Sequence, residues 1–374
     1  MNRDVLIIGG GVIGSSIAYY LAKQGVKVTV LERDRIAAHA SSSAAGMLGA
    51  QSEMEQPDPL VDLCLASRSM FPQLQKELVE VTGIDIELNQ AGLLKVATHE
   101  ETAERLKWRG KWQREMGLEA IWFEPYELYD KEPKLASRSL GALYLPNDYQ
   151  VSAPKLTRAF AQGAKQFGAE FIEHAEVIEV QCEKEQVVAV HTRTERYHAD
   201  QVVIAAGIWS QYIAELCRVP LPMKPLKGES LAIKPSYPLI QHTIFAERCY
   251  LVPKADGQII VGATEIPDEM SSHVTVKGVN TLLQAALELV PELAQSEWKR
   301  CWAGIRPGTN DGKPYLGKIS LYSNLYVACG HRRNGILLAP ITGKRMAQMI
   351  VDGSVTFDPA FRPERIWIGK EVIG

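Results

Sequence analysis

The clearest pattern of apolar and turn-forming positions lies in the first 32 residues of the chain. An aliphatic run, 5–8, leads directly into a glycine-rich turn, 9–14, and residues 15–23 predict a helix. A second apolar run, 26–31, ends in Glu32. Strand, glycine turn, helix, strand and acid in this order form the dinucleotide-binding fingerprint in its full context, which predicts a bound nucleotide cofactor.

Each part of this fingerprint has a physical role. Gly9 permits the tight turn after the strand, Gly11 lets a pyrophosphate approach the backbone, and Gly14 lets the helix pack closely on the strand. The helix N-terminus offers unpaired N–H groups and a partial positive charge to the phosphates. Glu32 is expected to accept hydrogen bonds from the ribose hydroxyls. A 2′-phosphate would meet its like charge, so NADP is disfavoured, although the neighbouring Arg33 keeps it from being excluded.

The rest of the chain alternates between strand-like and helix-like patterns. Spacing of apolar residues predicts helices over 58–82, 101–116, 124–131, 153–167, 274–289 and, after a proline, about 340–351. Strands are expected at 88–97, 140–145, 170–180, 187–192, 197–199, 201–204, 231–233, 249–253, 258–262 and 325–328. Trp108 and Trp112 share one face of a predicted helix, which more often indicates packing than binding.

Two further segments carry signals of a cofactor site. Residues 36–50 are rich in serine, alanine and glycine, and such small residues allow a backbone to lie against a flat ring. A flexible linker is the alternative for this segment. The apolar strand 201–204 runs into Ala205, Ala206 and Gly207, and cofactors lie at the carboxyl ends of strands in a doubly wound sheet. The nucleotide-binding domain therefore resumes near residue 151, after an insertion.

Length and composition limit the class of protein. With 374 residues the chain is too long for one core, so two domains are expected. The net charge is −3 and no long basic run is present, which argues against nucleic-acid binding. No stretch outside the glycine-interrupted N-terminus approaches the roughly 20 apolar residues of a membrane span. The six cysteines form no CxxC pair, so we expect a cytoplasmic protein without a metal site or a disulfide framework.

Seven motifs together resemble a known family. They are GGGVIG with Glu32, SSSAAGMLGA, AAGIW, PLKGE, CYLVP, WAGIRPGTNDGKPYLG and GHRRNGILLAPITG. Their order is similar to that of the D-amino-acid oxidase and sarcosine oxidase flavoproteins, and most similar to the glycine oxidase branch that serves thiazole synthesis for thiamin. The resemblance covers essentially the whole chain, and residues 302–343 are its most specific part.

The resemblance implies the fold and the domain organisation. It predicts an α/β protein in which a Rossmann-like FAD-binding domain is joined to an α+β substrate domain built around an antiparallel sheet. The FAD-binding domain would comprise residues 1–86, 151–221 and 305–374. The substrate domain would comprise residues 87–150 and 222–304. A homotetramer is also implied by the resemblance.

The resemblance also implies the chemistry. Non-covalently bound FAD would take a hydride at N5 from the α-carbon of glycine, sarcosine or a small D-amino acid. The products would be glyoxylate or a 2-oxo acid, ammonia or an amine, and, with O₂ as acceptor, hydrogen peroxide. A cysteine near the position of Cys301 carries the flavin covalently in the sarcosine oxidase branch, but we expect Cys301 to be a small buried strand residue.

The resemblance assigns residues to the substrate and to the cofactor. Arg306 would grip the substrate carboxylate, Tyr250 would bond the same group, and Arg333 would lie near the substrate. Without the motifs, Arg306 would be a surface ion-pair residue and Tyr250 a strand aromatic. His331 is expected to be a structural turn residue rather than a base. Cofactor contacts are expected from Gly9, Gly11, Val12, Ile13, Gly14, Glu32, Arg33, Ser42, Ser43, Ala45, Gly46, Met47, Val177, Ala206, Gly207, Trp209, Arg333, Asn334, Gly335, Ile336 and Leu337.

Several alternatives remain open from sequence. A D-amino-acid dehydrogenase that reduces a quinone would carry the same motifs, and an oxidase of a glycine-like group in modified tRNA or a non-catalytic nucleotide-bound regulator are more distant hypotheses. The substrate preference is open, as is whether Glu265 and Arg248 line the pocket. If the last helix points its N-terminus at the flavin, its dipole stabilises negative charge on the reduced ring.

Overall fold

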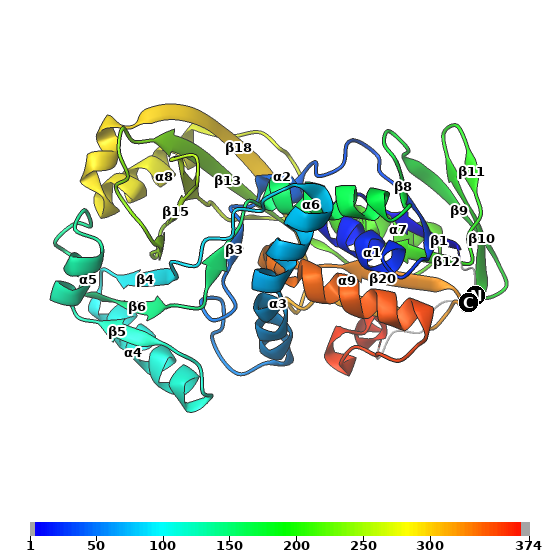
Figure 1. The fold of residues 1–374 in the computed structure, drawn as a ribbon, viewed down its shortest axis with the longest axis horizontal. Helices are drawn as coiled ribbons and strands as arrows, with labels where there is room; N and C mark the ends of the chain where they lie inside the picture. The colour runs from blue at the N-terminus through cyan, green and yellow to red at the C-terminus, as the bar shows by residue number, and fades with distance from the viewer. Residues whose placement is uncertain (1–3, 368–374) are drawn as a thin grey trace.

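A six-stranded sheet organises one half of the molecule. The computed structural model describes residues 4–367, and the sheet has the order β19-β20-β12-β1-β2-β8 (Figure 1). All neighbours pair in parallel except β19, which is antiparallel to β20. The strands are β1 (Asp4–Ile8), β2 (Lys27–Leu31), β8 (Glu170–Ile172), β12 (Gln201–Ile204), β19 (Tyr315–Lys318) and β20 (Leu325–Cys329). This is the doubly wound sheet that the N-terminal fingerprint predicts.

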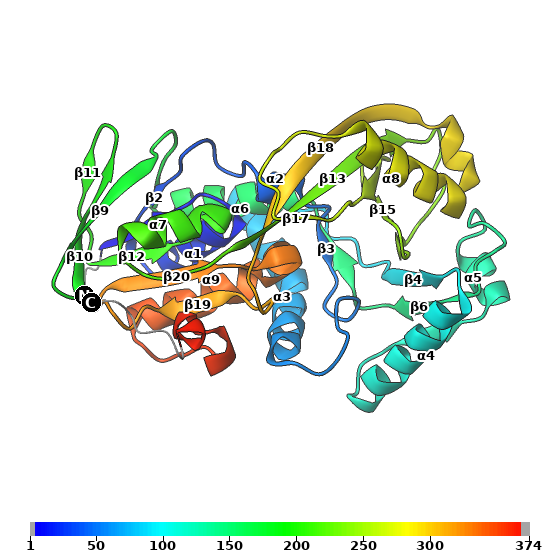
Figure 2. The same ribbon diagram turned by 180° about the vertical axis from the view of Figure 1, so that it is seen from behind.

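Alternate residues of β1 bury into two different cores. Val5 and Ile7 point to a helical layer, whereas Leu6 and Ile8 point to the opposite face. This period of two is what a strand buried on both faces produces. The helical layer consists of α1 (Val12–Ala22), α3 (Pro59–Thr82), α6 (Ala153–Gln166) and α9 (Gly335–Val351). The other face is covered by α7 (Ser210–Leu216) and a small sheet of β9 (Val177–Glu183), β10 (Gln186–Thr192) and β11 (Arg196–Tyr197) (Figure 2).

Helix α9 begins five residues earlier than the sequence predicts. The proline rule placed its start near Pro340, but Pro340 lies inside a helix that begins at Gly335. A proline removes one backbone donor, and here serines from neighbouring helices engage the local carbonyls. Ser67 Oγ donates to the Leu337 carbonyl at 2.6 Å, and Ser16 Oγ donates to the Ala339 carbonyl at 2.8 Å. Tertiary hydrogen bonds thus accompany the proline within the helix.

A nine-stranded, largely antiparallel sheet organises the other half. Its order is β17-β13-β16-β15-β14-β4-β6-β5, and β18 pairs with the free side of β13. The strands are β4 (Leu93–Ala97), β5 (Ile121–Phe123), β6 (Gly141–Leu145), β13 (Lys224–Lys234), β14 (Thr243–Phe245), β15 (Tyr250–Pro253), β16 (Ile259–Gly262), β17 (Ile266–Pro267) and β18 (Glu297–Gly308). The long pair β13 and β18 runs from this sheet to the centre of the molecule (Figures 1 and 2).

Three helices flank this second sheet. They are α4 (Glu100–Glu115), α5 (Pro125–Lys131) and α8 (Val276–Leu289). The packing interpretation holds for Trp112, which is buried, but Trp108 on α4 is 58% exposed. The remaining described elements are short: α2 (Ala40–Ser43), β3 (Met47–Leu48), β7 (Tyr149–Gln150) and the 3₁₀ turns η1 (Gly207–Trp209), η2 (Pro291–Gln295), η3 (Arg332–Asn334), η4 (Pro359–Phe361) and η5 (Pro363–Ile366).

Most predicted elements are confirmed, and the differences beyond α9 concern the bounds of one helix and one short strand. The first helix begins at Val12 rather than Ser15, since its N-cap, Gly11, belongs to the glycine turn. The sequence does not predict strand β5, which is only three residues long and so shows no clear alternation. The strands predicted within 170–180 are confirmed as β8 and the start of β9, which belong to different sheets.

The predicted fold class is confirmed, namely an α/β protein with a second part built around an antiparallel sheet. Strands of the second sheet come from residues 93–145 and 224–308. The proposed domain boundaries stay a prediction, and the one at 304/305 falls within β18. Residues 1–3 and 368–374, in the first and last predicted segments, lie outside the described residues.

Helices α1 and α9 cross so closely that a side chain at Gly343 has no room. A Cβ at this position would collide with the hydroxyl of Ser16, and would lie 2.8 Å from the backbone carbonyl oxygen of the same residue. We therefore expect Gly343→Ala to lower the free energy of unfolding by about 1–3 kcal/mol, as overpacked cores do. Lys344→Ala, on the exposed side of the same helix, is the control and should change stability by less than about 0.5 kcal/mol. Denaturant unfolding of both variants would measure this, and equal stabilities would contradict the packing argument.

Candidate functional site

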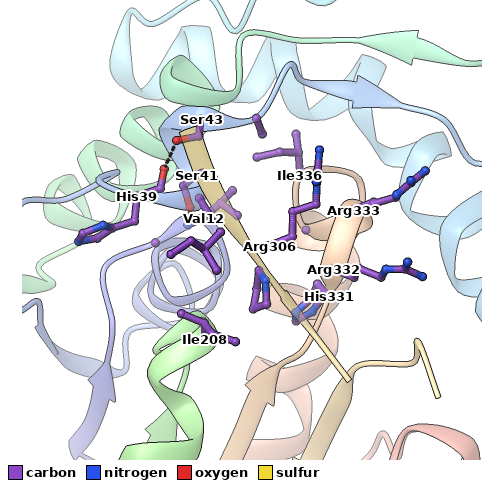
Figure 3. Close-up of a pocket in the computed structure, with 18 of the residues that line it drawn as sticks. Val12, His39, Ser41, Ser43, Ile208, Arg306, His331, Arg332, Arg333 and Ile336 are labelled. Atoms are coloured by element: carbon purple, nitrogen blue, oxygen red, sulfur yellow. Dashed lines mark hydrogen bonds between the residues drawn. The ribbon is translucent and has the colours of Figure 1, made fainter. Parts of the chain in front are cut away.

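A cavity of about 480 Å³ lies where the two sheets meet. The first sheet contributes the residues that follow the carboxyl ends of β1, β12 and β20, and the second contributes side chains from β13, β15 and β18. In Figure 3, Val12 and Ser41 lie to one side of Arg306, and Arg332 and Arg333 lie to the other. The volume of the cavity is in the range of small-molecule and cofactor sites.

The glycine turn brings bare backbone to the cavity. Gly9 has φ of +113°, and a Cβ there would lie 2.5 Å from the carbonyl oxygen of Ala205 at the end of β12. Gly11, the N-cap of α1, faces the cavity without a side chain. Helix α9 also begins at the cavity, because Gly335 lines it. Two helix N-termini therefore face one space, which suits a ligand with negatively charged phosphates and an electron-accepting ring.

Glu32 holds the glycine turn in place from the end of β2. Its two carboxylate oxygens accept hydrogen bonds from the backbone N–H groups of Gly10, at 2.7 Å, and Asp34, at 2.8 Å. It also lines the cavity. The acid at the end of the second strand thus shapes the turn and remains within reach of a ribose.

The serine segment faces the cavity with Ser43, which the sequence predicts, and with Ser41, which it does not. Ser41 Oγ accepts a hydrogen bond from the Val12 N–H at 2.9 Å and lines the cavity. Ser42 does not, because the turn of α2 directs its hydroxyl to the Ala37 carbonyl. Ser43 lines the cavity, and its hydroxyl donates to the His39 carbonyl at 2.9 Å (Figure 3). Ser42 therefore lies outside the cavity lining and Ser41 lies within it, and the cofactor contact of Ser42 stays a prediction.

A buried lysine joins this segment to the second sheet. Lys254, which follows β15, donates to the carbonyl oxygens of Ala45, at 2.6 Å, and Val151, at 3.1 Å, and to Gln150 Oε1, at 2.8 Å. Burial is the largest cause that lowers the pKa of Lys254, to about 7. Ala45 lines the cavity, so the lysine fixes cavity-lining backbone from outside.

Most of the predicted cofactor residues line one cavity. Those in the lining are Gly9, Gly11, Val12, Ile13, Glu32, Arg33, Ser43, Ala45, Gly46, Met47, Val177, Ala206, Gly207, Trp209, Arg333, Asn334, Gly335 and Ile336. Besides Ser42, Gly14 and Leu337 lie outside it. A Cβ at Gly14 would collide with the Gly9 carbonyl oxygen, so its role is the predicted close packing, and Leu337 is buried against the helical layer. Cofactor contacts themselves stay a prediction.

His39 is a cavity residue that the sequence did not reveal. Its backbone has φ of +56°, and its ring lies edge-on to Trp209 with the ring centroids 4.8 Å apart. The Arg33 guanidinium lies 4.1 Å from the centre of the Trp209 ring. Asp34 joins the group, and its hydrogen bond with His39 lowers the pKa of Asp34. Arg33, His39 and Trp209 form one wall of the cavity near Glu32.

Arg306 and Tyr250 enter the cavity from the second sheet, each packed over a glycine. The Arg306 guanidinium lies 2.5 Å from the position that a Cβ at Gly228 of β13 would take. The Tyr250 ring lies equally close to the position that a Cβ at Gly262 of β16 would take. Arg306 donates to the Thr264 carbonyl at 3.4 Å, and no ion pair to a carboxylate is found for it among residues 4–367. Its charge is therefore free for an anionic ligand.

Arg333 differs from Arg306 because its charge is compensated. It pairs with Glu53 at 3.3 Å and with Glu265. Glu265 and Arg248 both line the cavity, which answers the question left open by the sequence. Arg248 also pairs with Glu288, at 3.0 Å. Cys301, by contrast, is exposed on β18 and is absent from the lining, so the expectation of a buried residue is wrong.

His331 lines the cavity as a neutral side chain. Burial lowers the pKa of His331 to about 3, and Nε2 lies 3.2 Å from the Thr342 hydroxyl within the same turn-helix unit. This agrees with the prediction of a structural turn residue. Among the described residues no cluster of three or more metal-ligating side chains occurs, and no helix in 4–367 is long and apolar enough to cross a membrane.

Comparison with known proteins is consistent with this geometry. Residues 4–349 match the family described as FAD dependent oxidoreductase. The chain is 43% identical over 359 residues to a glycine oxidase of Geobacillus kaustophilus, covering 96% of this chain and 95% of that protein. A crystal structure of glycine oxidase from the same organism superposes with a TM-score of 0.94 at 42% identity, covering 97% and 99% of the two chains. The chain is also 37% identical to a bifunctional protein ThiO/ThiG of Synechocystis, covering 97% of this chain and 54% of that protein.

Removal of the Glu32 carboxylate should weaken cofactor binding. Glu32→Ala frees the N–H groups of Gly10 and Asp34, and charge-assisted hydrogen bonds of this kind justify an increase in the Kd for FAD on the order of tenfold or more. Flavin fluorescence titration of the apoprotein would measure the Kd. Glu173→Ala is the matched control, since Glu173 accepts from the Ile36 N–H at 2.7 Å outside the cavity. Equal effects of the two substitutions would argue against the role of Glu32.

The buried His331 should make the protein less stable in mild acid. Its pKa is about 3 in the folded chain and about 6.5 when unfolded, so the unfolded state binds the extra proton between these values. Its contribution to stability is complete above pH 6.5 and declines as the pH falls, by about 2 kcal/mol at pH 5. Denaturant unfolding of His331→Asn at pH 7 and pH 5 should lack this decline. The exposed His273→Asn should retain it, and a decline shared by both variants would exclude His331 as the cause.

Proposed function

The chain belongs to the family of FAD-dependent oxidoreductases, and from this premise we propose that it oxidises glycine, and also sarcosine and small D-amino acids. The products are glyoxylate or a 2-oxo acid, ammonia or an amine, and hydrogen peroxide. The observation that carries the proposal is the Arg306 guanidinium, which enters the cavity without a carboxylate partner among the described residues. A free guanidinium fork is suited to bind one carboxylate in a bidentate manner.

Arg306 and Tyr250 bind and orient the substrate. The arginine holds the carboxylate, and the Tyr250 hydroxyl donates a second hydrogen bond to it from the neighbouring part of the same sheet. The glycines beneath them fix both side chains against backbone, so the carboxylate is held in one place. The α-carbon of a bound amino acid is then presented toward the cofactor side of the cavity.

The residues that would hold FAD are those of the glycine turn and the two helix N-termini. Gly9, Gly11 and the N-terminus of α1 leave room and N–H groups for the pyrophosphate, and Glu32 faces the ribose. The N-terminus of α9 offers positive potential at the other end. When bound, FAD accepts the hydride of the substrate α-carbon and passes the electrons to oxygen.

No side chain of the site needs to remove the α-hydrogen as a proton. The amine must be neutral so that its lone pair can expel the hydride, and His331, with a pKa of about 3, adds no positive charge near it. The role of the protein is to orient the substrate and to adjust the electrostatics around it.

A D-amino-acid dehydrogenase that reduces a quinone is the alternative within the same fold. The visible spectrum of the purified protein, recorded with anaerobic glycine and then with air, tests both. Bleaching by glycine and recovery in air with release of peroxide supports the oxidase. Bleaching that only a quinone reverses supports the dehydrogenase. If sarcosine or a D-amino acid bleaches the flavin absorbance but glycine does not, the proposed chemistry stands and the proposed substrate is wrong.

Three further features belong to the proposal. We propose that the glycine imine supplies thiazole synthesis for thiamin, supported by the similarity to a protein called ThiO/ThiG. A homotetramer is proposed on family resemblance. A cytoplasmic location is supported by the six cysteines, all of them unpaired thiols in the structure.

Substitution of the two carboxylate-binding groups should separate their contributions. Arg306→Lys replaces a bidentate fork by a point charge, and we expect kcat/KM for glycine to fall on the order of 100-fold. Tyr250→Phe removes one hydrogen bond, and a fall of about tenfold is expected. Peroxide production at varied glycine concentrations measures both.

Arg248→Lys is the matched control. Arg248 lines the same cavity but pairs with Glu288, so we expect kcat/KM within about threefold of the original value. If Arg306→Lys behaves like this control, Arg306 does not hold the substrate carboxylate.

A further inference from the structure

Three side chains from distant segments form an ion-pair bridge in the wall of the cavity. Arg333 lies on η3, Glu265 follows β16, and Glu53 lies in the loop after β3. One guanidinium nitrogen of Arg333 lies 3.3 Å from Glu53 Oε2, and the other pairs with Glu265 Oε1. We call this set the acid–arginine–acid bridge. It places two negative charges beside one positive charge.

Both acids are attached to well-fixed backbone. The carbonyl oxygen of Ser52, next to Glu53, accepts from Lys95 Nζ at 2.8 Å and from Arg109 at 3.0 Å. The Ser52 N–H donates to Asp148, whose side chain is fully buried. Glu53 is thus attached to a buried polar network rather than to a free loop.

Glu265 is fixed through its neighbour Thr264. The Thr264 hydroxyl accepts from the Glu229 N–H at 2.9 Å, and the Thr264 N–H donates to the Glu229 carbonyl at 3.2 Å. Glu229 has no exposed side-chain surface. The carbonyl of Thr264 also accepts from Arg306. The same residue therefore joins the carboxylate-binding arginine to the bridge.

The bridge distinguishes two kinds of cation in the cavity, those paired with a carboxylate and those without such a partner. Arg306 is partly buried and has no carboxylate partner within residues 4–367, whereas the charge of Arg333 is already compensated. Arg332 and Arg333 both line the cavity and both are exposed, so solvent screens the charge of each, and the charge of Arg333 is compensated as well. The cavity therefore offers one effective site for one carboxylate. A second carboxylate would meet Glu53 and Glu265 with like charge.

We propose that Glu53 and Glu265 determine the specificity of this site, by pairing with Arg333 and so excluding amino acids that carry a second carboxylate. The inference rests on the proposed function, since it assumes that Arg306 holds the α-carboxylate. It predicts that removal of both acid charges frees Arg333 to bind the second carboxylate of a substrate such as D-aspartate.

The test compares two ligands that differ by one carboxylate. For Glu53→Gln, Glu265→Gln and the double variant, kcat/KM is measured for D-alanine and D-aspartate. We expect the ratio of D-aspartate to D-alanine to rise about tenfold or more in the double variant, and less in each single one. Glu247→Gln is the matched control, because Glu247 lines the cavity but bonds Thr98, at 3.0 Å, and leaves Arg333 paired. Its ratio should stay at the original value.

A second substitution separates the release of Arg333 from a general loss of negative charge. In the triple variant Arg333→Gln with Glu53→Gln and Glu265→Gln, the gain toward D-aspartate should disappear. An unchanged ratio in the double variant, a gain equal to that of Glu247→Gln, or a gain that survives in the triple variant would each overturn the proposal.

Calorimetry keeps this test independent of turnover. The Kd values of propionate and succinate, which lack the amine, are measured by titration on the holoenzyme and the same variants. The ratio of the propionate Kd to the succinate Kd should rise about tenfold in the double variant and return to its original value in the triple variant. If neither glycine nor D-alanine is oxidised, the proposed function fails in the turnover assay, while the calorimetric ratio still supports or overturns the role of the two acids.

Discussion

The close approach of backbone at the carboxyl ends of β1 and β12 is the constraint on which the rest of the structure depends. The Ala205 carbonyl oxygen lies only 2.5 Å from the position of a Cβ at Gly9, so the two strand ends meet because Gly9 has no side chain. This contact directs the chain into α1 with its N-terminus at the cavity. Helix α9 begins at the same cavity after β20. Parallel strands and short turns therefore collect two positive helix ends at one point.

The second sheet meets this point with side chains rather than backbone. Arg306 and Tyr250 are long residues packed over Gly228 and Gly262, so glycine again creates the room, but here for a neighbouring side chain. The two halves of the cavity therefore differ in the groups that they offer to a ligand. Backbone and helix ends are suited to a phosphate-bearing cofactor, while a guanidinium and a phenol are suited to a small anion. Each group is supported by the hydrogen bonding of a sheet.

Local signals in the sequence were sufficient for the first half of the site and much less so for the second. The glycine turn, Glu32 and the strand ending at Ile204 are contiguous patterns, and the structure has them as predicted. Arg306, Tyr250 and Arg333 were found only by resemblance to a family. The choice between Ser41 and Ser42 depended on the rotation of a four-residue helix, which composition does not determine.

Tertiary pairing explains the remaining differences. The start of α9 differs because Pro340 normally marks a boundary, and the Ser67 hydroxyl that donates to the nearby Leu337 carbonyl comes from 270 positions away in the sequence. The bridge of Glu53, Arg333 and Glu265 has no local signal in the sequence for the same reason.

Lys254 has a broader consequence, because it fastens backbone of the cofactor side to the strand that carries Tyr250. Ala45 lines the cavity, so FAD bound there would contact backbone that is tied to both sheets and, as a ligand of the folded chain, would raise the melting temperature of the whole molecule.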